Sequence, residues 1–210
     1  MNTGDRKMTE KNEGNYIIAA TKNKHKIEEI NAITAKFGMN IIPQDEAGFA
    51  NIDVVEDGET FEENSFKKAD AIMKASGKIT IADDSGLMVD ALGGAPGVYS
   101  ARFCGVEHDD KGNNEKLLKL LDGIPVEKRT AKFVTVITML FPDGEKIVAR
   151  GECPGRIATE TAGSEGFGYD PLFIPDGYDC QFAVLGQDAK NSISHRARAL
   201  QELERILSCR

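Results

Sequence analysis

Two adjacent carboxylates and a hydroxyl follow a short apolar run near the middle of the chain. Asp83, Asp84 and Ser85 come directly after residues 79–82, and Gly86 follows them. The run predicts a buried strand that ends at the carboxylates, and side chains that alternate along it should send Asp83 and Asp84 to opposite faces. One carboxylate can then serve a site while the other fastens a loop. Acidic residues at a strand end favour ligand chemistry in open α/β sheets, although the same residue types also form ordinary turns.

A basic turn follows the first apolar run, at residues 16–20, which predicts a strand. The turn consists of Thr21, Lys22, Asn23, Lys24, His25 and Lys26. A helix is expected next, because isoleucines recur at spacings of three from Ile27. The free N–H groups and the dipole of a helix start favour a phosphate, and lysines there are otherwise unfavourable. The turn is therefore a candidate phosphate site, with a solvated basic turn as the alternative.

Three further elements must position these residues. A capping box formed by Thr60 and Glu63 predicts a helix start after an acidic loop at 53–59. That helix carries Lys68, which could reach a phosphate, although most helix lysines are simply exposed. Residues 131–141 and 146–151 predict a hairpin around a turn at 142–145, so the sheet should be mixed. Ser194 is the expected N-cap of the last helix.

The composition limits the class of protein. The chain has 210 residues, 40% of them hydrophobic, and a formal net charge of −8. We expect one α/β domain over 15–210 after a disordered extension at 1–14. No apolar run approaches a membrane span, and the four scattered cysteines show no metal-ligand spacing, so a cytoplasmic protein with reduced thiols is expected. The acidic balance argues against general binding of nucleic acid or membrane, so an anionic ligand must meet a local basic cluster.

Five motifs together resemble the inosine triphosphate pyrophosphatase family over about residues 15–207. They lie at 21–26, 82–87, 94–102, 167–171 and 190–196, in the order and spacing of that family. The resemblance implies an elongated mixed β-sheet flanked by helices, with two lobes and a central cleft. It also implies a homodimeric enzyme that uses Mg²⁺ to hydrolyse non-canonical purine nucleoside triphosphates (ITP, dITP and XTP). The products would be the nucleoside monophosphate and pyrophosphate, and the reaction would cleanse the nucleotide pool.

The resemblance also implies roles for individual residues. Asp84 would be the catalytic acid/base and a metal ligand, Glu56 a second metal ligand, and Ser85 a neighbour of the substrate. The phosphate loop would consist of Thr21 to Lys26, and Lys68 on the later helix would also bind the substrate. The base pocket would consist of Phe167, Gly168, Tyr169, Asp170, Lys190, His195 and Arg196. Two positions depart from the family pattern, because Lys22 stands where Gly is frequent and Val184 stands where Glu is frequent.

The expected chemistry is consistent with these residue types. Phosphoryl transfer depends on positioning and charge neutralisation, and Mg²⁺ takes one or two carboxylates plus phosphate oxygens. Attack of water at the α-phosphorus would release pyrophosphate, with Asp84 orienting or deprotonating the water. Lys190 and Arg196 can only donate hydrogen bonds, which suits a 6-keto purine and not adenine. The alternatives are a nucleotide sensor without turnover and a hydrolase of canonical or pyrimidine triphosphates; a nucleic-acid-binding module is the weakest.

Overall fold

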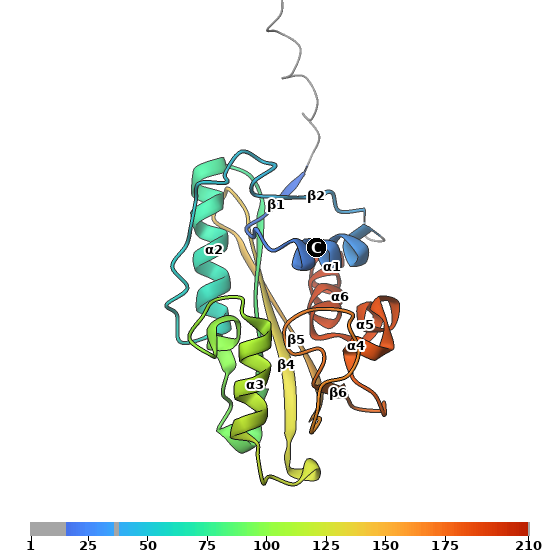
Figure 1. Ribbon diagram of the computed structural model, residues 1–210. Coiled ribbons are helices and arrows are strands. Elements are labelled where there is room, and N and C mark those ends of the chain that lie inside the picture. The colour runs from blue at the N-terminus through green and yellow to red at the C-terminus, as the bar shows by residue number, and fades with distance from the viewer. Residues whose placement is uncertain (1–15, 36–37, 210) are drawn as a thin grey trace, which may run out of the picture.

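The computed structural model describes residues 16–35 and 38–209, and the predicted extension at 1–14 lies outside them (Figure 1). A six-stranded mixed sheet forms the centre, in the order β2-β1-β3-β4-β5-β6. The strands are β1 (Ile17–Ala19), β2 (Ile41–Pro43), β3 (Thr80–Val89), β4 (Thr130–Leu140), β5 (Lys146–Ile157) and β6 (Phe173–Pro175). β1 pairs in parallel with β2 and β3, and all other pairs are antiparallel. The predicted mixed α/β sheet is confirmed.

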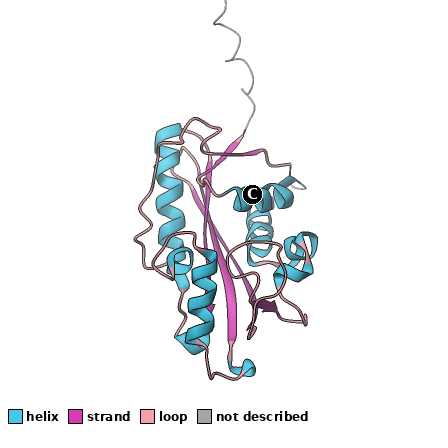
Figure 2. Ribbon diagram, in the orientation of Figure 1, coloured by secondary structure: helices cyan, strands magenta, loops and turns pink. Residues whose placement is uncertain are grey.

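The β4–β5 hairpin runs along the length of the molecule (Figure 2). Its turn has Gly144 in the left-handed region at φ 91°, and Phe141 N–H donates to the Glu145 carbonyl at 3.0 Å. Nearly every residue of β4 after Lys132 is buried, because helices and loops cover both of its faces. The hairpin thus forms the centre of the sheet, against which the helices pack.

Helices cover both faces of the sheet (Figure 1). The α-helices are α1 (Lys24–Thr34), α2 (Phe61–Ser76), α3 (Asp110–Leu120), α4 (Phe182–Leu185), α5 (Gln187–Ile193) and α6 (His195–Ser208). Short 3₁₀ turns are η2 (Asp90–Leu92), η3 (Gly97–Arg102) and η4 (Val126–Lys128). α1 and α6 pack on one face through Ile30 and Leu200, and α2 packs on the other through Ile72. No described helix is long and apolar enough to cross a membrane.

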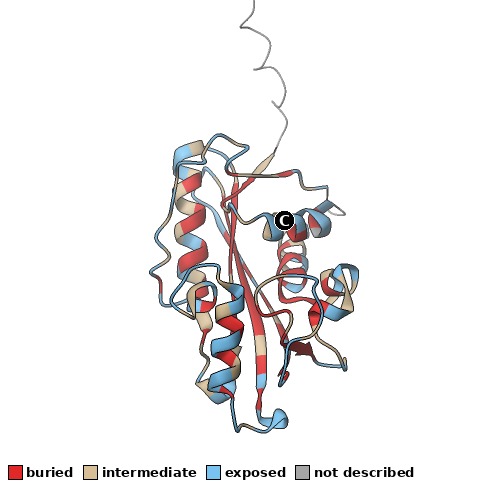
Figure 3. Ribbon diagram, in the orientation of Figure 1, coloured by how far each residue is buried: buried red, intermediate tan, exposed pale blue. Residues whose placement is uncertain are grey.

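A separate apolar cluster forms beyond the parallel part of the sheet. It joins Leu117 of α3, Phe133 of β4, Phe173 of β6 and Phe182 of α4. The buried sides of α2, α3 and the sheet face inward, while the outer helix faces are exposed (Figure 3). The clusters at the two ends of the long hairpin give the molecule an elongated form (Figure 1).

Local signals fixed the helix ends. The Thr60 hydroxyl accepts from Glu63 N–H at 3.1 Å, and the Glu63 carboxylate accepts from Glu59 N–H at 2.7 Å. Gly77 closes α2 at φ 64°. Ser194 caps α6 by accepting from Ala197 N–H at 3.2 Å. These interactions confirm both predicted caps.

The prediction that the central strand ends at the carboxylates is wrong. β3 continues to Val89, and Asp83 and Asp84 pair with Ile137 and Val136 of β4. The strand continues because β4 supplies an antiparallel neighbour along its full length, whereas β1 ends at Ala19, level with Ile81. The carboxylates therefore lie just beyond the parallel part of the sheet, although they are within a strand.

Candidate active site

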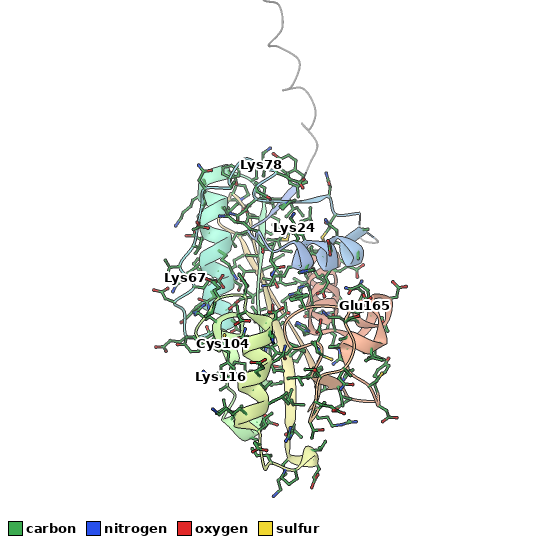
Figure 4. The ribbon with its side chains drawn as sticks, viewed as in Figure 1. Lys24, Lys67, Lys78, Cys104, Lys116 and Glu165 are labelled. Atoms are coloured by element: carbon green, nitrogen blue, oxygen red, sulfur yellow. The ribbon has the colours of Figure 1, made fainter. Side chains whose placement is uncertain are left out.

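A cleft of about 840 Å³ opens beside β3. It is lined by nearly all the predicted site residues: Thr21, Lys22, Asn23, His25, Lys26, Glu56, Lys68, Asp84, Ser85, Phe167, Gly168, Tyr169, Asp170, Lys190, His195 and Arg196. Lys24 is the exception, because its side chain is exposed and does not line the cleft (Figure 4). The structure thus brings together residues from all five motifs and from the helix that carries Lys68; the motif at 94–102 contributes Val98, Ser100, Ala101 and Arg102.

The start of α1 forms one end of the cleft. The Asn23 side chain caps the helix by accepting from Lys26 N–H at 3.2 Å, and the Thr21 hydroxyl accepts from Asn23 N–H at 3.1 Å. The Lys26 ammonium lies 3.2 Å from the Asp83 carboxylate, and burial lowers the pKa of Lys26. Lys22 instead pairs with Asp53 at 2.5 Å, and both of these side chains are substantially exposed. This end presents ammonium groups and a helix start to an anion.

Asp84 and Glu56 share one ammonium group. Lys68 Nζ donates to Glu56 at 2.7 Å and to Asp84 Oδ1 at 3.4 Å, and Lys68 is buried. Burial, reinforced by the charge of Glu56, raises the pKa of Asp84 against the opposing effect of Lys68 and Lys26. Burial also opposes ionisation of Glu56, but Lys68 outweighs it and the pKa of Glu56 is lowered. The pKa values of the two carboxylates are therefore shifted in opposite directions: that of Asp84 is raised and that of Glu56 is lowered.

The residues present fit a magnesium ion. Asp84 Oδ2 is buried and has no hydrogen-bond partner, and Glu56 lies beside the same ammonium group. No group of three or more His, Cys, Asp or Glu side chains suited to a metal occurs in the described part of the chain. A pair of carboxylates is nevertheless what Mg²⁺ takes when phosphate oxygens and waters complete its shell. Asp84 and Glu56 would hold the ion.

Asp83 faces the opposite side of β3, as predicted. Its Oδ2 accepts from Arg196 Nη2 at 2.9 Å and from the Ser85 hydroxyl at 3.2 Å, and it is 2% exposed. Burial opposes its ionisation, but Lys26 and Arg196 hold the pKa of Asp83 well below its usual range. Asp83 is a fixed anion that ties the phosphate end of the cleft to α6.

The other end of the cleft is aromatic and cationic. Lys190 Nζ lies 2.6 Å from Asp170, 2.7 Å from Glu29 and 4.6 Å from the centre of the Phe167 ring. Asp170 also accepts from Phe167 N–H at 2.9 Å. The Phe167 ring stacks on His25, with ring centres 5.3 Å apart. A planar base that enters here meets an aromatic face and a buried ammonium.

His195 has an unusual position among these residues. Its ring stacks on Phe133 with centres 4.7 Å apart, and Nδ1 is buried without a partner. Burial, together with the charge of Arg196, lowers the pKa of His195 well below 6.5. The imidazole is therefore neutral and has a hydrogen-bonding atom to spare at the cleft.

Sequence reasoning missed several contributors, including Val98, Ser100 and Arg102 of η3, which line the cleft. Glu29 is 2% exposed and forms ion pairs with Lys190 and Arg196, which places an acidic residue at the centre of the cationic cluster. Its position three residues after Lys26 on one helix face is the signal that could have identified it. Phe133 lies within a long strand and gave no such signal. Arg196 lines the cleft, but Glu29, Asp83 and Ser85 already engage its guanidinium, so its base-reading role stays a prediction.

Many known proteins are similar to this chain in sequence, and several are similar in structure. A relative from Clostridium perfringens, called a dITP/XTP pyrophosphatase, is 51% identical over 193 residues that span 89% of this chain and 94% of that protein. The structure of the Staphylococcus aureus Ham1 protein covers 92% of this chain and 98% of its own, with a TM-score of 0.82 and 42% identity. A HAM1 protein from Coxiella burnetii gives a TM-score of 0.83 at 36% identity and covers 93% and 99% of the two chains.

These relatives confirm the resemblance drawn from the five motifs. The family model described as the Ham1 family matches residues 17–206, which is nearly all of the described structure. The 51% identity to the Clostridium perfringens relative is taken over 193 residues, far more than any one motif. The chain belongs to the Ham1 family.

Proposed function

We propose that this chain is a Mg²⁺-dependent pyrophosphatase that hydrolyses dITP, XTP and ITP to the nucleoside monophosphate and pyrophosphate. The observation that carries the proposal is that Asp84 lines the cleft and has a buried Oδ2 without a hydrogen-bond partner. Burial also raises the pKa of this carboxylate. Relatives that cover most of the chain carry the name dITP/XTP pyrophosphatase.

The residues of the cleft divide the reaction between them. The triphosphate would lie against the start of α1 and the ammonium groups of Lys26 and Lys68. Asp84 would orient the attacking water or accept its proton, which is the usual role of a positioned carboxylate. A magnesium ion held by Asp84 and Glu56 would supply further neutralisation of phosphate charge. Attack at the α-phosphorus makes pyrophosphate the leaving group, and the lysines would stabilise its charge.

Recognition of the base is assigned to the aromatic end. Phe167 would stack on the purine, and Lys190 would donate to the 6-keto oxygen of hypoxanthine or xanthine. Adenine presents an amino group at that position, which would leave donor facing donor in a buried site. The spare nitrogen of His195 would read the same edge.

One assay tests the function directly. Pyrophosphate release would be measured for dITP, XTP, ITP, dATP, dGTP and dCTP, with Mg²⁺ and with EDTA. We expect release from the first three in Mg²⁺ and none in EDTA. Binding of dITP without release would favour the nucleotide sensor, and equal release from dATP or dCTP would favour a hydrolase of canonical or pyrimidine triphosphates. Asp84→Asn is the control that assigns any release to this cleft.

We also propose that the protein is a cytoplasmic homodimer without affinity for nucleic acid, as the family resemblance and the acidic charge suggest. Sedimentation equilibrium at several concentrations would give the oligomeric state. A monomer at all concentrations would contradict the first part of this proposal. Retention of the protein on immobilised single-stranded DNA at physiological salt would contradict the second.

A further inference from the structure

α3 holds the backbone N–H and the carbonyl of one residue in the aromatic turn, the segment 167–170. Asp110 Oδ2 accepts from Gly168 N–H at 2.7 Å, and Asn114 Nδ2 donates to the Gly168 carbonyl at 2.8 Å. Asp110 and Asn114 lie four residues apart, and therefore on the same face of the helix. Gly168 has φ 63°, a conformation that side-chain-bearing residues rarely adopt.

Asp110 and Asn114 form a clamp on Gly168, and further hydrogen bonds hold this clamp in place. Asn114 is 7% exposed, and its Nδ2 also donates to the Asp110 carbonyl at 2.9 Å, which fixes the amide relative to the helix. The Asp109 side chain caps α3 by accepting from Gly112 N–H at 2.9 Å, so the first turn of the helix is itself held in place. The clamp thus consists of two short hydrogen bonds from a capped helix turn, one from an exposed carboxylate and one from a buried amide.

The clamped residue lies between two residues of the proposed base pocket. Phe167 precedes Gly168 and contacts His25 and Lys190. Tyr169 follows it, and its hydroxyl donates to the Ser100 carbonyl at 2.9 Å. The bond from Phe167 N–H to Asp170 fixes the shape of the turn but not its place in the molecule. Its place depends on contacts with other elements, and α3 supplies two of them.

We propose that Asp110 and Asn114 are positioning residues for base recognition. They fix Gly168, and so hold the adjacent Phe167 ring beside Lys190 and His25, where the proposed function places the base. The inference deepens the proposed function and rests on it. Loss of the clamp should weaken binding of the base while the phosphate end and Asp84, on other elements, remain in place. Selectivity for a 6-keto purine should fall with it.

Three variants separate the clamp from other roles. Asp110→Ala removes the acceptor, whereas Asp110→Asn keeps an oxygen that can accept from Gly168 N–H. Asn114→Asp keeps the shape of the side chain but replaces the donor with an acceptor that faces a carbonyl. Glu115→Ala, on the same helix, is the matched control, because Glu115 is exposed and its ion pair with Lys111 spans 3.9 Å.

Three measurements are made on each full-length variant. The first is kcat and KM for dITP and dATP with Mg²⁺, the second is hydrogen exchange of peptides that contain Gly168, and the third is the melting temperature. We expect Asp110→Ala and Asn114→Asp to raise KM for dITP on the order of tenfold, the factor for one lost hydrogen bond, with kcat nearly unchanged. Exchange at Gly168 should accelerate in both. Asp110→Asn and Glu115→Ala should resemble the wild type.

Three outcomes would overturn the inference. If Asp110→Asn loses dITP binding as fully as Asp110→Ala, the carboxylate acts by its charge and not by holding Gly168. If exchange accelerates but KM and selectivity are unchanged, the position of the turn does not govern recognition. If kcat falls together with the melting temperature for both nucleotides, the residues serve the fold alone.

Failure of the proposed function gives a different result. The wild type would then release no pyrophosphate from any nucleotide, whatever the variants do. In that case the clamp is judged by the Kd of dITP from calorimetry, with the same ordering of variants expected. Equal affinities across all the variants would refute it.

Discussion

Asp83 and Asp84 are neighbours in the sequence with opposite electrostatic surroundings. Burial disfavours ionisation of Asp83, but the cations of Lys26 and Arg196 overcome it, and the carboxylate is a permanent anion. Burial raises the pKa of Asp84, and one of its oxygens is unpartnered. Strand alternation produces this division, because it sends the two side chains to faces covered by different helices. The first carboxylate stabilises the fold, and the second can accept a proton.

The two carboxylates should therefore respond differently to the same substitution. Asp84→Asn should lower kcat by at least about 10²-fold, the usual scale for a lost general base, without loss of stability. Asp83→Asn leaves buried cations without their anion, and we expect it to lower the free energy of unfolding by about 3 kcal/mol. Pyrophosphate release and urea unfolding measure the two effects. A near-normal kcat in Asp84→Asn would exclude this residue from the chemistry.

A second prediction at this scale concerns Phe167, whose half-buried ring faces His25 and Lys190. Phe167→Ala should weaken dITP binding by about 1–3 kcal/mol, the range for stacking of a base on an aromatic side chain. Inorganic tripolyphosphate has no base and serves as the internal control, so its Kd should not change. Equal weakening for both ligands would show that Phe167 holds the cleft open and does not stack on the base.

At the scale of elements, α6 is positioned by its close approach to β5. A Cβ at Gly151 of β5 would overlap the carbonyl oxygen of His195 and the backbone of Ala199. These atoms belong to the helix backbone and cannot rotate away. The small residue therefore allows the helix to lie directly on the strand, and this contact fixes where the first turn of α6 meets the cleft.

Gly151→Ala should accordingly displace the start of α6. We expect a loss of about 1–3 kcal/mol in the free energy of unfolding, the range for overpacked sites, and a higher KM for dITP because His195 moves with the helix. Val148→Ala is the matched control on the same strand, since Val148 is 39% exposed and should cost little. Unchanged stability in Gly151→Ala would mean that α6 can shift along the strand without cost.

At the scale of the whole molecule, buried charges connect the two ends of the cleft. Lys26 of α1 contacts Asp83, Asp83 contacts Arg196 of α6, and Arg196 contacts Glu29, which contacts Lys190 of α5. Although burial opposes its ionisation, the charges of Arg196 and Lys190 lower the pKa of Glu29 to about 2. The network joins the phosphate end to the base end, and protonation of Asp83 or Glu29 would break it.

The network predicts how stability depends on pH. His195 has a lowered pKa in the folded state, so the unfolded chain binds more protons below pH 6.5 and stability falls on acidification. Glu29 contributes stability above its ordinary value of 4.5, which is lost as the pH falls towards 2. Asp84 and Asp170, whose pKa values are raised by burial, oppose this acid loss. Protonation of Asp84 and Asp170 therefore opposes the effect of His195, and a variant of His195 is needed to separate the two.

Urea unfolding at pH 7, 6 and 5 tests this. The wild type should lose up to about 1.4 kcal/mol per pH unit below pH 6.5. His195→Gln, which cannot take up a proton, should have a shallower dependence on pH over the same interval. His108→Gln removes an exposed imidazole and should keep the wild-type slope. Identical slopes in all three proteins would show that His195 does not carry the effect.

The sequence by itself determined the local features and the identity of most cleft residues. The caps at Thr60 and Ser194 and the hairpin at 142–145 depend on residues a few positions apart, whose hydrogen bonds form within one turn. The predicted site residues line one cleft, with Lys24 as the exception.

Only the tertiary structure decided how these residues are supported. β3 continues past the carboxylates because β4, some fifty residues away, offers a partner for each peptide. Arg196 meets Asp83 across 113 positions and Glu29 across 167. The grip of α3 on Gly168 joins residues 58 positions apart. Such partners depend on how α1, α3 and α6 cross the sheet, and a buried charge or peptide group is satisfied by whichever segment packing brings to it.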